Sequence, residues 1–492
     1  MQRITPDRPY PLFDTAATRR IEQTAAASLP PHTLMQRAGL AVARLAMALA
    51  PHARRVWIAC GPGNNGGDGL EAATQLHLRG KTVLVTWLGL ETSAPADSLA
   101  ALARARAAGV PFADAPPTGL TAQDLCIDAL LGIGSSRAPA GTMAAWITAM
   151  NASPAPTLAV DLPTGLQADT GKFAIQSVAT NADEISGSGT IYAKNTLCLL
   201  SLKPGLFTGH GRDTAGQVWL DDLGIGAGSV PTAQLVGAPV TACRTHASHK
   251  GNYGDVAILG GAPGMAGAAL LAASAALHTG AGRVFVGLLD GGSLGVHPQQ
   301  PELMFRAPSA LPLHALAVVC GCGGGEAVRA LLPRVLAEAA RLVLDADALN
   351  AIATDTALQA PLRARAAQGL PTVLTPHPLE AARLLGCSTS QIQADRLGAA
   401  QQLADRFACV VVLKGSGTVI AAPSQLPNIN PTGNGRLATA GTGDVLAGMV
   451  GARLAMGQYA VAAACEAVYA HGLAADHWPA DQPLTASTLA RT

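Results

Sequence analysis

The segment GPGNNGGDG, residues 61–69, most restricts what this chain can fold into. It follows an apolar run, 54–60, and precedes an Ala- and Leu-rich stretch that ends near Gly80. We therefore expect a strand, a glycine-rich loop and a helix, followed by a second strand at 81–89. Free backbone N–H groups and the dipole at the start of a helix favour a bound phosphate. The alternative is a tight strand-to-helix turn that binds nothing.

The glycine spacing also satisfies the G-x-G-x-x-G pattern of dinucleotide-binding domains, but that pattern alone is weak. In such domains the next strand ends at an acidic residue that binds a ribose hydroxyl. Here the next strand, KTVLVTW, ends without one. The sequence therefore disfavours an ordinary dehydrogenase.

Two further apolar runs end at an aspartate, Asp128 in DALLGIG and Asp161 in DLPTGL. In a mainly parallel sheet the carboxyl ends of the strands lie at one edge, so these two loops and the glycine-rich loop are expected to converge. Upstream, residues 14–50 are expected to be helical, with Asp14 able to cap the first helix. One aspartate after a strand is more often a helix cap than a catalyst. Three such loops together indicate a site.

The 492 residues of the chain exceed the size of one hydrophobic core, so at least two domains are expected. Residues 223–245 carry Gly and Pro interruptions without a sustained period, which predicts a boundary near 230 and domains of residues 1–228 and 229–492. The strand and helix pattern then restarts in GDVAILGG, RVFVGLL and RLVLDADALNAIA. No internal repeat relates the halves, so we expect two unrelated α/β domains fused in one chain.

The segment Ala438–Asp444, ATAGTGD, precedes a predicted helix and is the main candidate site of the second half. Gly-rich N–H groups at a helix start form an anion hole, and Asp444 could accept the proton of an attacking hydroxyl, as phosphoryl transfer requires. The turn Lys414–Thr418 offers a cation, backbone donors and a hydroxyl to a nucleotide, although it is not a Walker A loop. Other polar residues that follow strand-like runs are Asp345, Asp347, His377 and Glu380.

Charge and composition restrict the partners. The 33 basic and 32 acidic residues nearly cancel, so a nucleic acid is not expected, and no basic run or long apolar segment predicts contact with a membrane. The nine cysteines lack the spacing of a zinc site or a disulfide scaffold, and MQRITPDRPYPLF lacks a signal-peptide core, so we expect a cytoplasmic protein that binds small molecules. The Ala-rich helices could pack in a homo-oligomer or in the interior, so the oligomeric state stays open.

The motifs GPGNNGGDG, DALLGIG and DLPTGL, with MQRAG and LKPGL, make residues 10–225 resemble the NAD(P)H-hydrate epimerase family. The resemblance implies a Rossmann-like three-layer sandwich. It also implies that two segments hold the phosphates and riboses of the substrate, namely Asn64, Asn65, Gly66, Gly67 and Asp68, and Gly132, Ile133, Gly134, Ser135, Ser136, Arg137 and Ala138.

By the same resemblance, Asn65, Asp128 and Thr164 would bind a potassium ion through oxygen ligands. Asp161 would contact the hydrated nicotinamide ring and act as acid and base. Gln36 and Met143 depart from the usual residues of the family, so the wall beside the ring is expected to differ.

The segments HKGNYGDVAILGG, LDADALN, LTPHPLE, LKGSGT and NPTGNGRLATAGTGDVLAG make residues 240–492 resemble the ADP- or ATP-dependent NAD(P)H-hydrate dehydratases. This resemblance implies a ribokinase-like three-layer sandwich and a magnesium ion that accompanies the nucleotide. The residues implied to contact the hydrate are Ala268, Gly323, His377 and Asp444. Those implied to contact the nucleotide are Lys414, Gly415, Ser416, Gly417, Thr418 and Gly443.

Cys322 and Leu379 replace a Pro and a Gly of that family at turn positions. We interpret Cys320 and Cys322 as core or turn residues rather than nucleophiles. ADP is the expected nucleotide, because fused two-domain forms resemble the prokaryotic branch.

The chain is therefore expected to repair hydrated NADH and NADPH, called NADHX and NADPHX. Residues 1–228 would exchange their R and S epimers, and residues 229–492 would dehydrate the S epimer with ADP, giving AMP and phosphate. One alternative is a ribokinase-like small-molecule kinase with an accessory nucleotide-binding domain, which would release a stable phosphorylated product. Another is a nucleotide sensor that binds without turnover.

Overall fold

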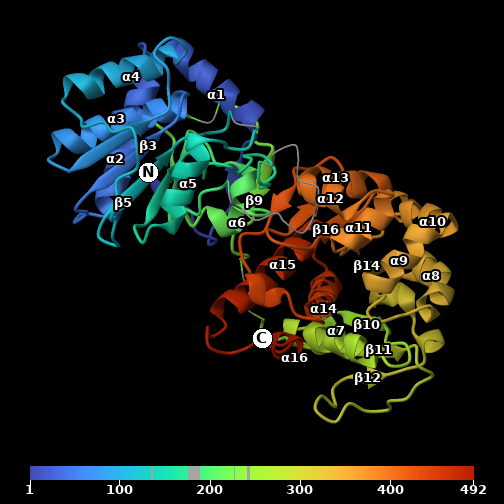
Figure 1. Ribbon diagram of the computed structural model, residues 1–492. Helices are drawn as coiled ribbons and strands as arrows, with labels where there is room; N and C mark the ends of the chain where they lie inside the picture. Colours follow the sequence, from blue (N-terminus) through green and yellow to red (C-terminus); the bar gives the residue numbers. More distant parts are fainter. Residues whose placement is uncertain (135–136, 175–188, 227, 241–243) are drawn as a thin grey trace. The chain divides into compact units, whose positions relative to one another are not determined.

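The computed structural model describes residues 1–134, 137–174, 189–226, 228–240 and 244–492. The chain divides into two compact units, one of Met1–Thr5 with Tyr10–Ala233 and one of Pro6–Pro9 with Gln234–Thr492. Each unit has a mainly parallel sheet with helices packed on both of its faces (Figure 1). The expectation of two α/β domains is confirmed, and the boundary between residues 228 and 229 stays a prediction.

The sheet of the first unit has the strand order β1-β8-β7-β6-β5-β3-β4. Its strands are β1 (Gln2–Arg3), β3 (Val56–Cys60), β4 (Val83–Trp87), β5 (Leu125–Ala129), β6 (Thr157–Val160), β7 (Asn195–Leu199) and β8 (Gln217–Asp221). Of these neighbours, only β1 and β8 pair antiparallel. The chain passes from β3 to β4 on one side and returns through β5 on the other. The order therefore reverses between β3 and β5, and open α/β sheets bind ligands outside the carboxyl ends of the strands at such a point.

Helices cover both faces of this sheet (Figure 1). They are α1 (Thr15–Ser28), α2 (Thr33–Leu49), α3 (Asn64–Leu78), α4 (Ala96–Ala107), α5 (Thr142–Ala152) and α6 (Gly211–Thr214). Helices α2, α3 and α4 pack on one face, where Ile58 is fully buried, and α5 packs on the other, where Trp57 is buried. The Asp14 carboxylate accepts a hydrogen bond from the N–H of Ala17 at 2.7 Å, which confirms the predicted cap of α1.

The sheet of the second unit runs β12-β11-β10-β13-β14-β15-β16-β17-β18. Its strands are β10 (Asp255–Gly260), β11 (Arg283–Leu288), β12 (Met304–Phe305), β13 (Ala317–Cys320), β14 (Arg341–Leu344), β15 (Thr372–Leu374), β16 (Val410–Leu413), β17 (Val419–Ala421) and β18 (Asn428–Ile429). Two further short strands are β2 (Tyr10–Leu12) and β9 (Ala233–Leu235). The pairs from β12 to β16 are parallel, and β17 pairs antiparallel with both of its neighbours in this order. The order reverses between β10 and β13, so this unit has its own switch point.

The helices of the second unit also form two layers. They are α7 (Ala266–Thr279), α8 (Ala327–Glu338), α9 (Ala346–Thr354), α10 (Thr356–Ala367), α11 (Pro378–Leu385), α12 (Thr389–Ala394), α13 (Arg396–Phe407), α14 (Thr442–Ala455), α15 (Ala460–His477) and α16 (Ala486–Leu489). Helices α7, α14 and α15 cover one face and α8 to α13 the other. A Cβ on Gly448 of α14 would stand 2.1 Å from the backbone oxygen of Ala272 in α7. Small residues therefore allow close packing inside the unit, and the oligomeric state stays open.

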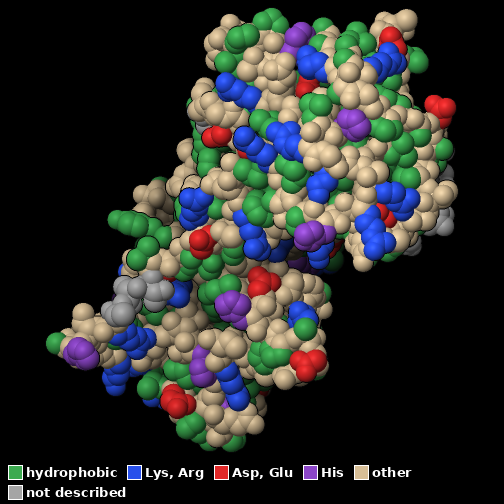
Figure 2. Space-filling model, turned by 90° about the vertical axis from the view of Figure 1, so that its left-hand side faces the viewer, with side chains coloured by type: hydrophobic (Ala, Val, Ile, Leu, Met, Phe, Trp, Pro, Cys, Tyr) green, Lys and Arg blue, Asp and Glu red, His purple; other side chains and the backbone are tan. Residues whose placement is uncertain are grey.

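None of the helices in the described ranges is both long enough and apolar enough to cross a bilayer. On the face shown in Figure 2, Lys and Arg side chains are spread among acidic and neutral ones rather than merged into one patch. The expectation that nucleic acid is not a partner stays a prediction.

Candidate functional site

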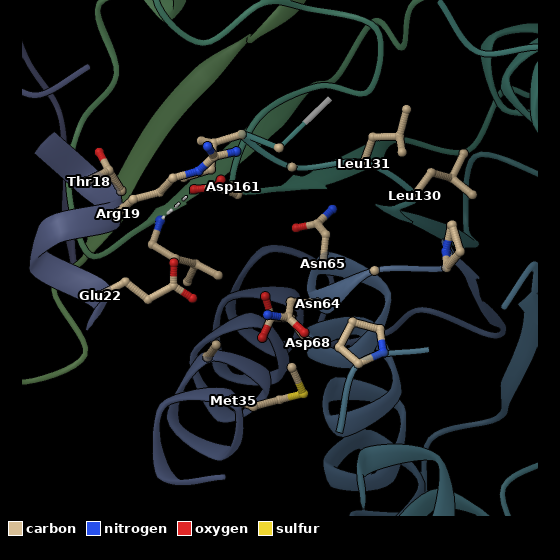
Figure 3. A pocket seen from close by; sticks show the side chains of 18 of the residues that line it. Thr18, Arg19, Glu22, Met35, Asn64, Asn65, Asp68, Leu130, Leu131 and Asp161 are labelled. Atoms are coloured by element: carbon tan, nitrogen blue, oxygen red, sulfur yellow. Dashed lines mark hydrogen bonds between the residues drawn. The ribbon is translucent and has the colours of Figure 1, made fainter. Parts of the chain in front are cut away.

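A cavity of about 890 Å³ opens in the first unit where the strand order reverses. The ends of β3, β5 and β6 bring their loops to it, so the three loops singled out in the sequence do converge (Figure 3). The predicted residues that line it are Asn64, Asn65, Asp68, Gly132, Ile133, Gly134, Arg137, Ala138, Met143 and Asp161. Ser135 and Ser136 lie outside the described residues. Gln36 is exposed on α2 and is not part of the cavity wall, so of the two departures only Met143 faces the cavity.

Most glycines of the 61–69 segment serve packing. Helix α3 begins at Asn64, so Gly66 and Gly67 lie inside the helix and are buried, whereas the sequence predicted a loop there. A Cβ on Gly66 would stand 2.0 Å from the backbone oxygen of Gly61, and one on Gly67 would stand 2.5 Å from a methionine sulfur. Neither residue lines the cavity. Gly63 does, and a Cβ there would have no atom within 4 Å.

Asp161 directly follows β6 and faces the cavity. Its backbone has a φ of 70°, in the left-handed region that residues other than glycine rarely adopt. Its carboxylate accepts a hydrogen bond from Nζ of Lys203, which also donates to the backbone oxygen of Leu199 at 2.9 Å. The Lys203 side chain is fully buried and that of Asp161 is 11% exposed, so the carboxylate is the exposed member of this ion pair.

Asp128 and Thr164 are buried behind the cavity wall. The Asp128 carboxylate accepts hydrogen bonds from the N–H and the hydroxyl of Thr164, at 2.8 and 2.7 Å, and from the N–H of Leu130 at 3.2 Å. Burial raises the pKa of Asp128 to about 6, because these uncharged donors lower the pKa by less than burial raises it. On the cavity wall, the side-chain nitrogen of Asn65 is buried without a hydrogen-bond partner among the described residues. Among the described residues, the Asp128 carboxylate is therefore held by neutral donors alone.

Helix α1 forms a further wall of the cavity through Thr18, Arg19 and Glu22 (Figure 3). Burial raises the pKa of Asp68 well above its usual range, and the charges of Asp161 and Glu22 raise it further. Burial and Asp161 raise the pKa of Glu22 as well. The cavity therefore holds several acidic side chains whose mutual repulsion favours protonation.

In the second unit, Asp444 stands near the start of α14, after Gly441 with a φ of 88°. One oxygen of Asp444, one oxygen of Asp345 and the sulfur of Cys322 all lie within 4.8 Å of one another. Burial raises the pKa of Asp444 to about 6, with a contribution from the Asp345 charge, while the Cys322 thiol and Lys414 lower it. A carboxylate with such a pKa is mostly ionised at neutral pH and can accept a proton from a hydroxyl.

Lys414, at the end of β16, joins the same group. Its Nζ donates to the Asp345 carboxylate at 2.8 Å, and a Cβ on Gly443 would stand 3.2 Å from that nitrogen. Burial lowers the pKa of Lys414, but the charges of Asp345 and Glu380 outweigh it and the pKa is raised. The ammonium group therefore lies beside the N-terminus of α14, so its charge and the positive end of the helix dipole act at the same place.

The rest of the turn after β16 is shaped by glycines and by a buried arginine. Gly415 and Gly417, on either side of Ser416, have φ values of 137° and 60°. The Thr418 hydroxyl donates to the backbone oxygen of Gly415 at 3.1 Å. A Cβ on Gly415 would stand 2.7 Å from a guanidinium nitrogen of Arg396, so only glycine leaves room there.

His377 caps α11. Its Nδ1 accepts hydrogen bonds from the N–H groups of Leu379 and Glu380, at 3.1 and 3.3 Å. Burial and the charge of Lys414 lower the pKa of His377, so at neutral pH the ring is uncharged with its proton on Nε2. Burial raises the pKa of Glu380, whose carboxylate lies 3.3 Å from Nε2, to about 7.

Ala268 and Gly323 meet at the switch point between β10 and β13. A Cβ on Gly323, where φ is 58°, would stand 2.9 Å from the Cβ of Ala268. Any side chain on Gly323 would therefore collide with α7.

Two family models match the chain in its two halves. One, described as YjeF-related protein N-terminus, matches residues 31–205, and the other, described as NAD(P)H-hydrate dehydratase, matches residues 256–492. The bifunctional NAD(P)H-hydrate repair enzyme Nnr of Escherichia coli (strain K12) is 37% identical over 486 residues, covering 95% of this chain and 90% of that protein. The chain belongs to the family of bifunctional NAD(P)H-hydrate repair enzymes. Membership confirms the two resemblances and favours a repair enzyme over a small-molecule kinase with an accessory domain.

Members and relatives of the family also match the second half alone. The ADP-dependent (S)-NAD(P)H-hydrate dehydratase of Neisseria meningitidis serogroup B is 43% identical over 240 residues, covering 47% of this chain and 80% of that protein. Among solved structures, the ADP/ATP-dependent NAD(P)H-hydrate dehydratase from Bacillus subtilis, co-crystallized with ATP/Mg2+, is 32% identical. It covers 50% of this chain and 90% of that chain, with a TM-score of 0.43.

Several side chains at the two sites were not predicted from the sequence. Lys203 lies in the LKPGL motif, which was the available signal, but no role was given to it. Arg19 and Glu22 belong to a helix with no motif. Cys322 is buried as predicted, and its sulfur also lies 3.9 Å from the Asp345 carboxylate. Burial raises the pKa of this thiol well above its usual range, in keeping with a cysteine that is not a nucleophile.

Proposed function

We propose that this chain repairs hydrated NADH and NADPH, with the first unit exchanging the R and S epimers and the second dehydrating the S epimer with ADP. One observation carries the proposal: a chain of this family has two separate carboxylate sites. Asp161 faces the cavity of the first unit, and Asp444 stands at the start of α14 in the second. Each lies at the carboxyl edge of its own sheet, so each unit has the means for one of the two reactions.

In the epimerase reaction, Asp161 acts as acid and base at the C6 hydroxyl of the substrate. The C6–O bond breaks while the lone pair of the ring nitrogen forms a C=N bond to C6, and the hydroxyl takes a proton and leaves as water. Water then adds to either face of C6, the C=N electron pair returns to nitrogen, and the proton is given back. The proton is held by the ion pair of Asp161 and Lys203 and reaches the hydroxyl through Asp161. Lys203, being buried, is a positioning residue.

Two segments would hold the remainder of the substrate. The start of α3, Asn64–Asp68, presents N–H groups and the positive end of a helix dipole, which suit a phosphate. The segment Gly132–Ala138 would hold the other phosphate oxygens and the riboses. Support comes from the residues of these segments that line the cavity, namely Asn64, Asn65, Asp68, Gly132, Ile133, Gly134, Arg137 and Ala138.

A potassium ion is proposed at Asn65, Asp128 and Thr164. Their amide, carboxylate and hydroxyl oxygens suit such a hard cation. Asp128 is a buried carboxylate that has only uncharged hydrogen-bond partners among the described residues, so a cation there would offset its charge. Bound there, potassium would neutralise Asp128 and steady the loops after β3, β5 and β6.

In the dehydratase reaction, Asp444 accepts the proton of the C6 hydroxyl while the hydroxyl oxygen attacks the β-phosphorus of ADP. The bond from that phosphorus to the oxygen of AMP breaks, and the phosphoryl group passes to the oxygen on C6. The C6–O bond then breaks, phosphate leaves, C5 loses a proton, and the electron pair of the C5–H bond forms the C5=C6 double bond of NAD(P)H. The N–H groups at the start of α14 would stabilise the moving phosphoryl group.

The remaining proposed contacts divide between the two ligands. Ala268, Gly323 and His377 would contact the hydrate, and Lys414, Gly415, Ser416, Gly417, Thr418 and Gly443 the nucleotide. Magnesium would enter with ADP and neutralise charge on its phosphates. The carboxylate of Asp345 suits that ion, whereas the thiol of Cys322 beside it does not.

A cytoplasmic location is part of the proposal. Every cysteine that the structure describes is free of a disulfide, which suits a reducing compartment.

Recovery of NADPH from a mixture of both NADPHX epimers tests the proposal. With potassium, magnesium and ADP, the full chain is expected to restore all of the hydrate and release inorganic phosphate; parallel runs with ATP test nucleotide choice. Asp444→Asn should stop recovery but leave epimer exchange, followed by chromatography, and Asp161→Asn should restore only the S epimer. A mixture of the two variants should restore both epimers to NADPH.

Restoration of only the S epimer by the unaltered chain would refute the epimerase proposal. A stable phosphorylated product would favour a kinase.

A further inference from the structure

Helix α1 places the guanidinium of Arg19 in the cavity, where the nearby Glu22 feels its charge without forming a salt bridge with it in the described residues. The basic side chains lining the cavity in the described residues are Arg19, Arg137 and Lys203. Lys203 is paired with Asp161, whereas the Arg19 guanidinium makes no hydrogen bond or salt bridge within the described part of the chain. Arg19 is exposed to the cavity, and Figure 3 shows it extending from α1 across the space toward the segment that carries Asp161.

The guanidinium ends against the loop that follows β5. An Nη atom of Arg19 lies 3.8 Å from the position that a Cβ on Gly134 would take. Gly134 has no side chain, so a ligand lying on this loop can approach both its backbone and the guanidinium. Backbone N–H groups of a glycine loop facing an arginine fork form a site for phosphate oxygens.

We propose that Arg19 binds the pyrophosphate of the dinucleotide hydrate, so that α1, which precedes the segment matched by the N-terminal family model, completes the substrate site. This inference rests on the proposed epimerase function. The acidic side chains on the cavity wall include Glu22, Asp68, Asp97 and Asp161, and those that are ionised would repel an anionic substrate that Arg19 attracts.

The position of Arg19 favours the pyrophosphate over the 2′-phosphate of NADPHX. A Cβ on Gly132 would stand 3.4 Å from the Asp161 carboxylate, and Gly134 is two residues farther along the loop. Two residues span at most about 7 Å, so Arg19 lies close to the reacting ring. The pyrophosphate is joined to the nicotinamide through one ribose, whereas the 2′-phosphate is carried by the second ribose. Arg19 should therefore serve NADHX and NADPHX alike.

The test uses Arg19→Ala, Arg19→Lys and a matched control, Arg20→Ala, in the full chain. Arg20 is the next residue of α1, is exposed and does not line the cavity. Conversion of the R epimers of NADHX and NADPHX is followed separately, with ADP and magnesium in excess so that the second unit turns each S epimer into NAD(P)H. Dehydration of pure S epimer measures folding and activity of the second unit in the same samples.

Arg19→Ala should raise KM for both R epimers by about 10-fold or more, the usual effect of a lost charge-assisted hydrogen bond, and change kcat by less than about 2-fold. Arg19→Lys should recover part of the loss, and Arg20→Ala should match the unaltered chain. An unchanged KM, an equal rise in Arg20→Ala, a fall in kcat alone, or a rise limited to NADPHX would each overturn the assignment.

A binding titration separates this inference from the epimerase function. Nicotinamide mononucleotide carries the phosphate next to the nicotinamide ribose, and nicotinamide riboside lacks it. Arg19→Ala should weaken binding of the mononucleotide by a similar factor and leave the riboside unaffected. Equal weakening of both, or of neither, would refute the role of Arg19. Failure of the unaltered chain to consume R epimers while these titrations behave as expected would refute the epimerase function alone.

Discussion

The rate of dehydration should fall in acid with a midpoint that reports the buried position of Asp444. Burial and the nearby Asp345 raise the pKa of Asp444 from its ordinary value of 3.8 to about 6. Because the group has to accept a proton, only its ionised form is active. With a pKa of 6, the ionised fraction is about nine-tenths at pH 7, one-half at pH 6 and one-tenth at pH 5. An aspartate with an ordinary pKa would stay almost fully ionised over this range.

The measurement is kcat/KM for the S epimer, whose pH dependence reports the enzyme before the hydrate binds, followed by the return of NADPH absorbance at about pH 5 to 8. The expected profile loses about 10-fold in rate per pH unit well below its midpoint. Cys322→Ala should move the midpoint upward, because the Cys322 thiol donates to the Asp444 carboxylate and lowers its pKa. Asp444→Asn should lower kcat by about 10²- to 10⁴-fold, as loss of a general base does. Epimer exchange in the same samples controls for damage to the protein in acid.

Two results would refute this reasoning. A midpoint near 4 would mean that burial does not act on the catalytic group. If the residual activity of Asp444→Asn still falls in acid with a midpoint near pH 6 or 7, that midpoint belongs to another group. Glu380, whose pKa is raised to about 7, is then the first candidate, and Glu380→Gln would identify it.

Three further perturbations test the first unit. Lys203→Met should lower the free energy of unfolding of this unit by about 3–5 kcal/mol in denaturant titrations, because the largely buried carboxylate of Asp161 loses its partner. Lys194→Met, at an exposed lysine, is the control, and an equal effect of both variants would contradict this account. Gly66→Ala should lower the free energy of unfolding by about 1–3 kcal/mol, because its Cβ would stand 2.0 Å from a backbone oxygen. Gly63→Ala, where a Cβ meets no atom, should keep the original Tm, and the same Tm for both variants would refute the packing role. Replacing potassium with choline should slow epimer exchange and leave dehydration of the S epimer unchanged, and an unaltered exchange rate would argue against the ion site.

The order of strands and helices could be predicted because apolar runs and glycine turns alternate with a clear period. Strand β14, for example, ends at Leu344, directly before the predicted Asp345. The start of α3 could not be predicted in the same way. Consecutive glycines predict a loop by local propensity, but close packing of Gly66 and Gly67 against neighbouring elements favours a helix, and such tertiary packing overrides propensity.

The site could be predicted where its residues lie at the ends of strands. Asp128, Asp161 and Asp345 were found in this way, because the carboxyl ends of parallel strands share one edge. Lys203 and Arg19 could not be assigned. Each reaches its neighbours across a long stretch of sequence, and local patterns contain no information about such contacts.

The left-handed backbone of Asp161 has a consequence for the evolution of the family. A side chain in this conformation costs about 1 kcal/mol relative to glycine, so the fold alone would favour a different residue here. Loss of selection for epimer exchange would remove the reason to keep an aspartate. Its replacement would leave a buried ammonium group at Lys203 without its partner, so the two positions should drift together. Relatives with Gly or Asn at the position of Asp161 and an uncharged residue at the position of Lys203 would then have kept the fold and lost epimer exchange.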